Sequence, residues 1–117
     1  MTTRIGIVGA GPSGLAALHE FCKEGDFCIT VFERESAAGG QWKLPSSASS
    51  MYEHLWSNGP KECIEVPDFT FEKCFGKRLP SYPPRKVVQE YLYRRYRDVV
   101  ASRKIKFDAE VKGLWKE

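Results

Sequence analysis

Residues 4–14 read RIGIVGAGPSG, an apolar run that leads directly into three glycines with the spacing G-x-G-x-x-G. The apolar run is typical of a strand that is buried on both faces of a parallel sheet. In a turn of this spacing, the first glycine permits the bend, the second lets a pyrophosphate approach the backbone, and the third lets the next helix pack closely on the strand. The stretch therefore predicts a strand, a tight turn and a helix whose N-terminus binds phosphate groups.

An amphipathic helix and a second strand are predicted after the turn. Apolar residues from Leu15 to Cys22 recur at helical spacing, and Gly25 is placed to end the helix. Residues 26–33 read DFCITVFE, which predicts a parallel strand that ends on Glu33, about twenty residues beyond the glycines, where an acid accepts hydrogen bonds from ribose hydroxyls. The residues expected to contact a dinucleotide are Gly9, Ala10, Gly11, Pro12, Ser13, Gly14 and Glu33.

This order of strand, helix and strand with a terminal acid predicts the first half of a Rossmann βαβ unit in an α/β fold. A glycine-rich turn in an unrelated fold is the alternative to the nucleotide site. For Glu33 the alternative is a solvated residue at the end of a strand.

The rest of the chain predicts one long helix and further strands. Residues 84–101 form an amphipathic pattern with proline at the first turn, and Ile105 and Phe107 alternate with charged residues as a third parallel strand. Residues 110–115 are expected to add one more strand. The predicted apolar stripe of the long helix consists of Val88, Leu92, Tyr96 and Val99.

Composition limits the classes of function. The chain has 117 residues, 42% of them hydrophobic, and a net charge of +3, which suits one small globular domain with a modest core. Arg94, Arg95 and Arg97 cluster on the long helix and are expected to face solvent. A nucleic-acid partner is therefore not predicted.

The cysteines and histidines give no sign of a metal site. Four cysteines lack C-x-x-C pairing and have no histidine at ligand spacing, so we expect reduced thiols in a cytoplasmic protein, with Cys22 and Cys28 inert in the core. His19 and His54 are interpreted as partly buried side chains. No membrane-spanning segment or signal peptide is predicted, and residues 45–50 are expected to form a flexible loop.

More selective motifs follow the acid. Residues 39–42 read GGQW, residues 51–62 read MYEHLWSNGPKE, and residues 81–85 read SYPPR. With the glycine turn, PDF at residues 67–69 and FGK at residues 75–77, these motifs resemble the flavin-containing monooxygenase family, most closely its bacterial trimethylamine monooxygenase branch. The resemblance covers almost all 117 residues.

The resemblance implies a fold and a set of cofactor contacts. Residues 1–117 would be the N-terminal part of a Rossmann-like FAD-binding domain, incomplete and with an irregular excursion after the second strand, while the NADPH domain and the C-terminal part are absent. Gly39 and Gly40 would let the backbone pass beside a flat ring system. The further residues implied to contact FAD are Gly40, Gln41, Trp42, Ser57, Asn58 and Gly59.

Asn58 is the catalytic residue that the resemblance implies, near the flavin carbon that carries the oxygen adduct. An uncharged amide can hydrogen-bond a peroxide without offering an acidic proton. Two simpler interpretations remain open, in which Trp42 is a core anchor and Asn58-Gly59 is ordinary turn chemistry.

The family activity would use FAD, NADPH and oxygen to oxygenate a soft nitrogen or sulfur nucleophile, such as a tertiary amine, through a C4a-hydroperoxyflavin. A chain of this length alone is expected to be an inactive fragment. The alternative is a non-catalytic module that binds FAD, ADP or a partner protein. The sequence leaves homodimer formation by a full-length form open.

Overall fold

The sheet is parallel and has the strand order β1-β2-β3. The computed structural model of the chain describes residues 2–44 and 49–117, so most of the predicted loop at 45–50 lies outside the described residues. The strands are β1 (Thr3–Val8), β2 (Phe27–Phe32) and β3 (Ile105–Lys106). β1 pairs with β2 from Thr3–Phe27 to Val8–Phe32, and β3 pairs with the end of β2. This register confirms the parallel Rossmann-like sheet.

Three α-helices and two single 3₁₀ turns are described. They are α1 (Pro12–Lys23), α2 (Phe71–Phe75), α3 (Arg85–Val100), η1 (Gly40–Trp42) and η2 (Lys61–Cys63). α1 begins directly after the glycine turn, and Gly25 follows its end with φ of +90°, a conformation that favours glycine. Both features of the first helix agree with the sequence-based expectation.

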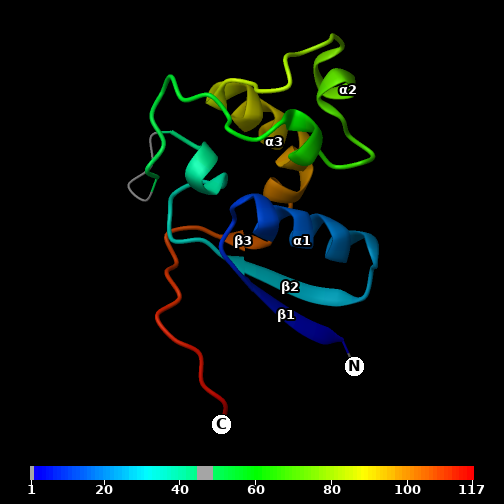
Figure 1. The fold of residues 1–117 in the computed structure, drawn as a ribbon. Coiled ribbons are helices and arrows are strands. Elements are labelled where there is room, and N and C mark those ends of the chain that lie inside the picture. Colours follow the sequence, from blue (N-terminus) through cyan, green and yellow to red (C-terminus); the bar gives the residue numbers. More distant parts are fainter. Residues whose placement is uncertain (1, 45–48) are drawn as a thin grey trace.

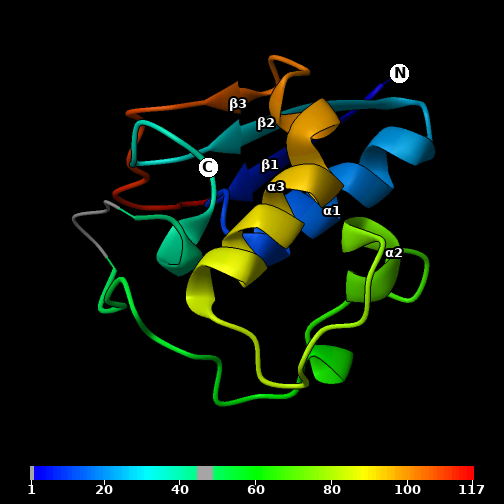
Figure 2. The same ribbon diagram turned by 90° about the horizontal axis from the view of Figure 1, so that it is seen from above.

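Both long helices cover the same face of the sheet, with α3 packed on α1 (Figure 1, Figure 2). The prediction that β1 is buried on both faces is therefore wrong for this chain. Val8 is 61% exposed, and Arg4 and Gly6 are also exposed, because their side of the strand faces away from α1. Cys28 pairs with Arg4 in the register and is exposed on that face, so its predicted place in the core is also wrong.

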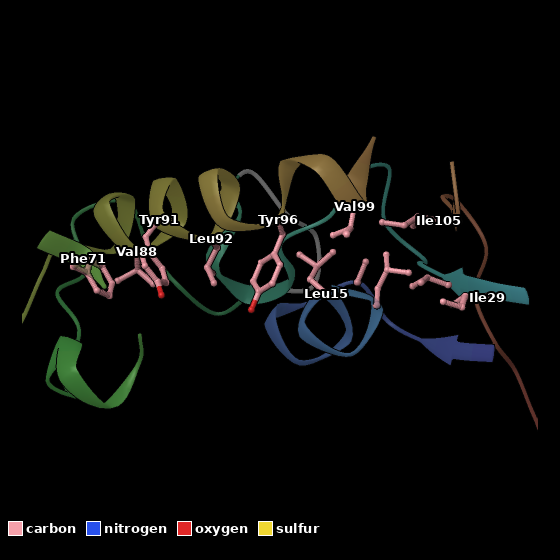
Figure 3. Close-up of a cluster of buried hydrophobic side chains, with 12 residues drawn as sticks. Leu15, Ile29, Phe71, Val88, Tyr91, Leu92, Tyr96, Val99 and Ile105 are labelled. Carbon is pink, nitrogen blue, oxygen red and sulfur yellow. The ribbon is translucent and has the colours of Figure 1, made fainter. Parts of the chain in front are cut away.

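The core runs as a strip from the sheet, between α1 and α3, to α2 (Figure 3). Ile29 and Ile105 lie at the sheet end of the strip, and Leu15 lies in its middle, beside Tyr96. At the other end, the Tyr91 ring stacks on Phe71 with centroids 4.1 Å apart. The predicted stripe of α3 is confirmed, because Val88, Leu92, Tyr96 and Val99 are all buried.

A long irregular connection joins β2 to α3, as predicted. Trp56 forms an isolated antiparallel bridge with Pro84, which brings the middle of this connection to the start of α3. Within α3, Arg95 departs from the expectation of a solvent-facing cluster. Its side chain is only 11% exposed, because it pairs with Asp68 at 3.0 Å and lies over the Phe69 ring.

Two further expectations are corrected. Residues 110–115 form no strand, because their backbone makes no hydrogen bond to another segment of the described chain, and a strand needs a partner. His54 is exposed in a turn, whereas His19 is partly buried in α1 as expected, edge-on to Tyr96. Burial, and next the charge of Arg95, lower the pKa of His19.

Candidate cofactor site

A cleft of about 410 Å³ lies at the carboxyl ends of β1 and β2. Ligands of open α/β sheets bind at this edge, because the loops that follow the strands surround it. The residues that line the cleft are Val8, Gly9, Gly11, Phe32, Glu33, Arg34, Glu35, Gly40, Gln41, Ala109, Glu110 and Val111. The predicted residues Gly9, Gly11, Glu33, Gly40 and Gln41 are therefore brought together.

The glycine turn and the GGQW segment touch each other at the cleft. A Cβ at Gly14 would lie 1.9 Å from the carbonyl oxygen of Gly9, so only glycine allows this close packing of α1 on the turn. A Cβ at Gly40 would lie 3.0 Å from Cα of Gly11, and Gly40 has φ of +59°. The Gly39 amide donates to the carbonyl of Ala10 at 2.9 Å. The two glycine segments thus form one continuous wall.

The N-terminus of α1 follows directly on this wall, because Gly11 belongs to both. Gly11 is the N-cap residue, and its position carries no side-chain cap in the described structure. Pro12 at the first helical position has no N–H to satisfy. The remaining amides of the first turn, with the positive end of the helix dipole, suit a phosphate group.

Glu33 links the two strands at the base of the cleft. Its side chain is 6% exposed, and its carboxylate accepts hydrogen bonds from the amides of Ala10 at 2.6 Å and Glu35 at 2.8 Å. A carboxylate has about four acceptor positions, so both oxygens retain acceptor capacity toward the cleft. This geometry suits hydrogen bonds from sugar hydroxyls, which is the role predicted for Glu33.

Trp42, Pro12 and Ser13 lie behind the cleft wall. Trp42 packs against the buried core and borders two smaller cavities of about 220 Å³, and Pro12 and Ser13 border one of them. Ala10 is fully buried. The structure thus places Gln41 at the cleft and the Trp42 ring in a core-anchor position, while contact of either side chain with a flavin stays a prediction.

Ser57, Asn58 and Gly59 form a turn outside the cleft. The Ser57 hydroxyl donates to the Gly59 carbonyl at 2.8 Å and accepts from the Gly59 amide at 3.2 Å. The Ser57 amide donates to the carbonyl of Pro83 at 2.9 Å, and Asn58 is exposed. Hydrogen bonding of this kind is ordinary Ser and Asn turn chemistry. The catalytic role of Asn58 stays a prediction.

Sequence reasoning missed part of the cleft and two buried cations. Arg34 and Glu35 could have been found from their position directly after Glu33. Residues 109–111 gave no signal, and residues 110–115 were expected to form a strand. Lys61 and Arg85 are each 5% exposed. No pattern in the sequence distinguishes these two buried cations from the solvated ones.

Lys61 is the centre of a charged network between η2 and α2. Its ammonium group pairs with Glu62 and, at 2.9 Å, with Glu72. Hydrogen bonds from Lys61 lower the pKa of both carboxyl groups, and the same bonds raise the pKa of Lys61. The network joins η2 to α2 within the long connection.

Other classes of site find little support in residues 2–44 and 49–117. These residues include no group of three or more His, Cys, Asp or Glu side chains placed to hold a metal ion. None of their helices has the length and apolar character needed to cross a membrane.

Comparisons with known proteins identify the family. A model of the flavin-binding monooxygenase-like family matches residues 2–117. The trimethylamine monooxygenase of Methylocella silvestris is 39% identical over 96% of this chain and 28% of its own length. These matches confirm the resemblance inferred from the motifs.

Solved structures show the same fold. The crystal structure of Tmm from Pelagibacter sp. strain HTCC7211 matches 91% of this chain with a TM-score of 0.79 and 38% identity. The S-allyl-L-cysteine S-oxygenase from Allium sativum matches 100% of it with a TM-score of 0.81 and 32% identity. This chain covers 28% and 30% of those two chains, so it spans less than a third of the relatives it matches.

Proposed function

The chain belongs to the flavin-binding monooxygenase-like family, and we propose that it is the N-terminal FAD-binding segment of a flavin- and NADPH-dependent monooxygenase. The proposed substrates are soft nitrogen or sulfur nucleophiles, such as tertiary amines. The observation that carries the proposal is the cleft in which the glycine turn, Glu33 and the Gly40–Gln41 backbone meet. One wall offers amides for phosphate and another offers a carboxylate for ribose.

Different residues of the cleft would bind different parts of FAD. The first turn of α1 would bind the pyrophosphate, and Glu33 would accept hydrogen bonds from the ribose of the adenosine half. Gly40 and Gln41 would border the flavin half, because they continue the same wall beyond Gly11. Bound FAD, reduced by NADPH, would supply the activated oxygen.

Asn58 would act on the oxygen-bearing face of the flavin. It is exposed and outside the cleft of this chain, so its proposed role requires the flavin ring to extend toward the Ser57–Gly59 turn. The Ser57 hydrogen bonds hold this turn independently of the Asn58 side chain. An amide at this position can donate to a bound oxygen species without supplying an acidic proton.

The proposal is tested in a polypeptide extended to the length of the relatives. We expect consumption of NADPH and oxygen that depends on added trimethylamine or a dialkyl sulfide, with one oxygenated product per NADPH. Asn58→Ala is expected to leave NADPH oxidation in place but to divert at least half of the oxygen to hydrogen peroxide. The reason is that the variant loses a hydrogen bond that stabilises the transition state of oxygenation. Full coupling in the Asn58 variant would remove Asn58 from the mechanism.

A binding function without catalysis is the second candidate. The observation that favours it is the separation of Asn58 from the cleft, because the residues that line the cleft include the glycine turn, Glu33, Gly40 and Gln41 but not the proposed catalytic residue. The 117-residue chain would then bind FAD and ADP with similar affinity. A cytoplasmic location also stays a prediction.

A further inference from the structure

Arg85 is a buried cation that no carboxylate neutralises among the residues that the structure describes. The residue is 5% exposed, and none of the ion pairs includes it. Its Nε is buried without a hydrogen-bond acceptor in that same part of the chain. Burial of a guanidinium without a carboxylate partner costs free energy. The contribution of Arg85 is therefore judged by its hydrogen bonds, in comparison with a neutral side chain at the same position.

The hydrogen bonds of Arg85 join two separate segments. Its Nη1 donates to the carbonyl oxygen of Trp42 at 2.9 Å and also to Oε1 of Gln89, one turn further along α3. The Arg85 amide donates to the carbonyl of Leu55 at 2.8 Å. One residue at the start of α3 therefore fixes both the Gly40–Trp42 turn and the segment that leads to Ser57.

The Gly40–Trp42 turn needs such a contact. Gly39 and Gly40 have φ of +130° and +59°, so neither residue confines the backbone as a residue with a Cβ would. In the described structure, three hydrogen bonds tie residues 39–42 to parts of the chain beyond the neighbouring Lys43: Gly39 N–H to Ala10, Ser49 Oγ to Gln41 at 2.6 Å, and Arg85 to Trp42. The bond from Arg85 is the only one with a charged donor, and such bonds are about twice as strong as neutral ones.

We infer that Arg85 is a positioning residue, which holds the Gly40–Trp42 turn in place so that Gly40 and Gln41 can border the flavin half of FAD. This inference rests on the proposed function. It assigns Arg85 no contact with FAD, because Arg85 does not line the cleft. The adenosine half, which the glycine turn and Glu33 would hold, is independent of Arg85.

The test compares the affinities of the 117-residue chain for FAD and for ADP. In Arg85→Met, which keeps most of the side-chain length without charge or donors, we expect FAD to bind about tenfold more weakly, with ADP affinity changed by less than about twofold. Arg85→Lys, which keeps one donor group, is expected to weaken FAD binding by about threefold with ADP unchanged. Arg97→Met is the matched control, since Arg97 is 65% exposed on the same helix, and should change neither affinity.

The outcomes separate a positioning role from a structural one. Equal losses of FAD and ADP affinity in Arg85→Met, or no loss of either, would overturn the inference. If the Met variant does not fold, the Lys variant decides alone by the same ratio of affinities. A wild-type chain that binds ADP but no FAD overturns the proposed flavin site itself, and this inference with it.

Discussion

At the scale of single residues, Gly14 and Gly11 of the turn are glycine for different physical reasons. Gly14 has no room for a Cβ, which would lie 1.9 Å from the Gly9 carbonyl oxygen. At Gly11, a Cβ would meet only Cα of Gly40, at an ordinary 3.7 Å, and the Gly11 backbone has φ of −76°. The packing of the fold therefore requires glycine at position 14. It does not require glycine at position 11, so we attribute Gly11 to the approach of the ligand.

We predict that Gly14→Ala destabilises the chain by about 3 kcal/mol or more, because the backbone of the turn must move away from α1. Gly11→Ala should change the free energy of unfolding by no more than about 0.5 kcal/mol. Urea denaturation of both variants measures the difference. Equal stability of the two variants would show that the close contact between α1 and the turn does not constrain Gly14.

The residue scale also shows where the sequence was informative. The glycine spacing and Glu33 could be placed because their backbone geometry and hydrogen bonding follow from local motifs. Trp42, Arg85 and Lys61 could not, since their environments depend on residues far away in the chain. Cys28 was misplaced because the sequence of a strand does not reveal whether both of its faces are covered.

At the scale of elements, one network holds the long connection against α3, and a second network holds two parts of this connection together. One is the buried Tyr91, whose hydroxyl donates to the carbonyl of Phe69 and accepts from the amide of Val66 at 2.9 Å. Burial raises the pKa of Tyr91, so the hydroxyl remains neutral at all ordinary pH values. The other is the ion-pair network around Lys61.

We predict that Tyr91→Phe destabilises the chain by about 1–3 kcal/mol, because it leaves a backbone amide and a carbonyl without their partner while the stacked ring remains. Thermal denaturation measures the effect. Tyr93→Phe is the control, since Tyr93 is 63% exposed on the same helix and should change stability little. A neutral result for Tyr91→Phe would mean that water replaces the hydroxyl at no cost.

The Lys61 network predicts a dependence of stability on pH. The pKa of Glu72 in the folded chain is below its ordinary value of 4.5, so its ionised form stabilises the fold above pH 4.5. This contribution is lost as the pH falls from 4.5 through the lower pKa of the folded state. Glu72→Gln should therefore lower the urea midpoint at neutral pH and flatten its decline in acid.

The control for the pH measurement is Glu53→Gln, which alters an exposed carboxyl group in a turn. Its urea midpoint should follow the wild type across the pH range. Parallel acid declines in wild type and Glu72→Gln would show that the network adds nothing to stability.

At the scale of the whole molecule, one face of the sheet lies open and the last residues extend away from it (Figure 1). The radius of gyration is 15.4 Å, above the about 13 Å expected for a compact domain of this length. The parallel pairing and the helix order were predictable from period and motif. The open face and the unpaired residues 110–115 were not, because they depend on which partners a strand finds.

The nucleotide-binding part of the proposed site and its proposed catalytic residue lie in different places. Gly9, Gly11 and Glu33, which are proposed to contact the adenosine diphosphate group, line the cleft, whereas Asn58 lies on a turn outside it. This arrangement predicts that the 117-residue chain binds a dinucleotide without measurable catalytic activity.

The most direct test of the central claim is equilibrium dialysis of FAD against the wild-type chain and Gly11→Ala. We predict saturable binding of one FAD per wild-type chain, and at least about a tenfold loss of affinity in Gly11→Ala at unchanged stability, because the added methyl group stands where the pyrophosphate must approach the backbone. Absence of FAD binding by the wild type, or equal affinity in both chains, would contradict the assignment of this cleft as the flavin nucleotide site.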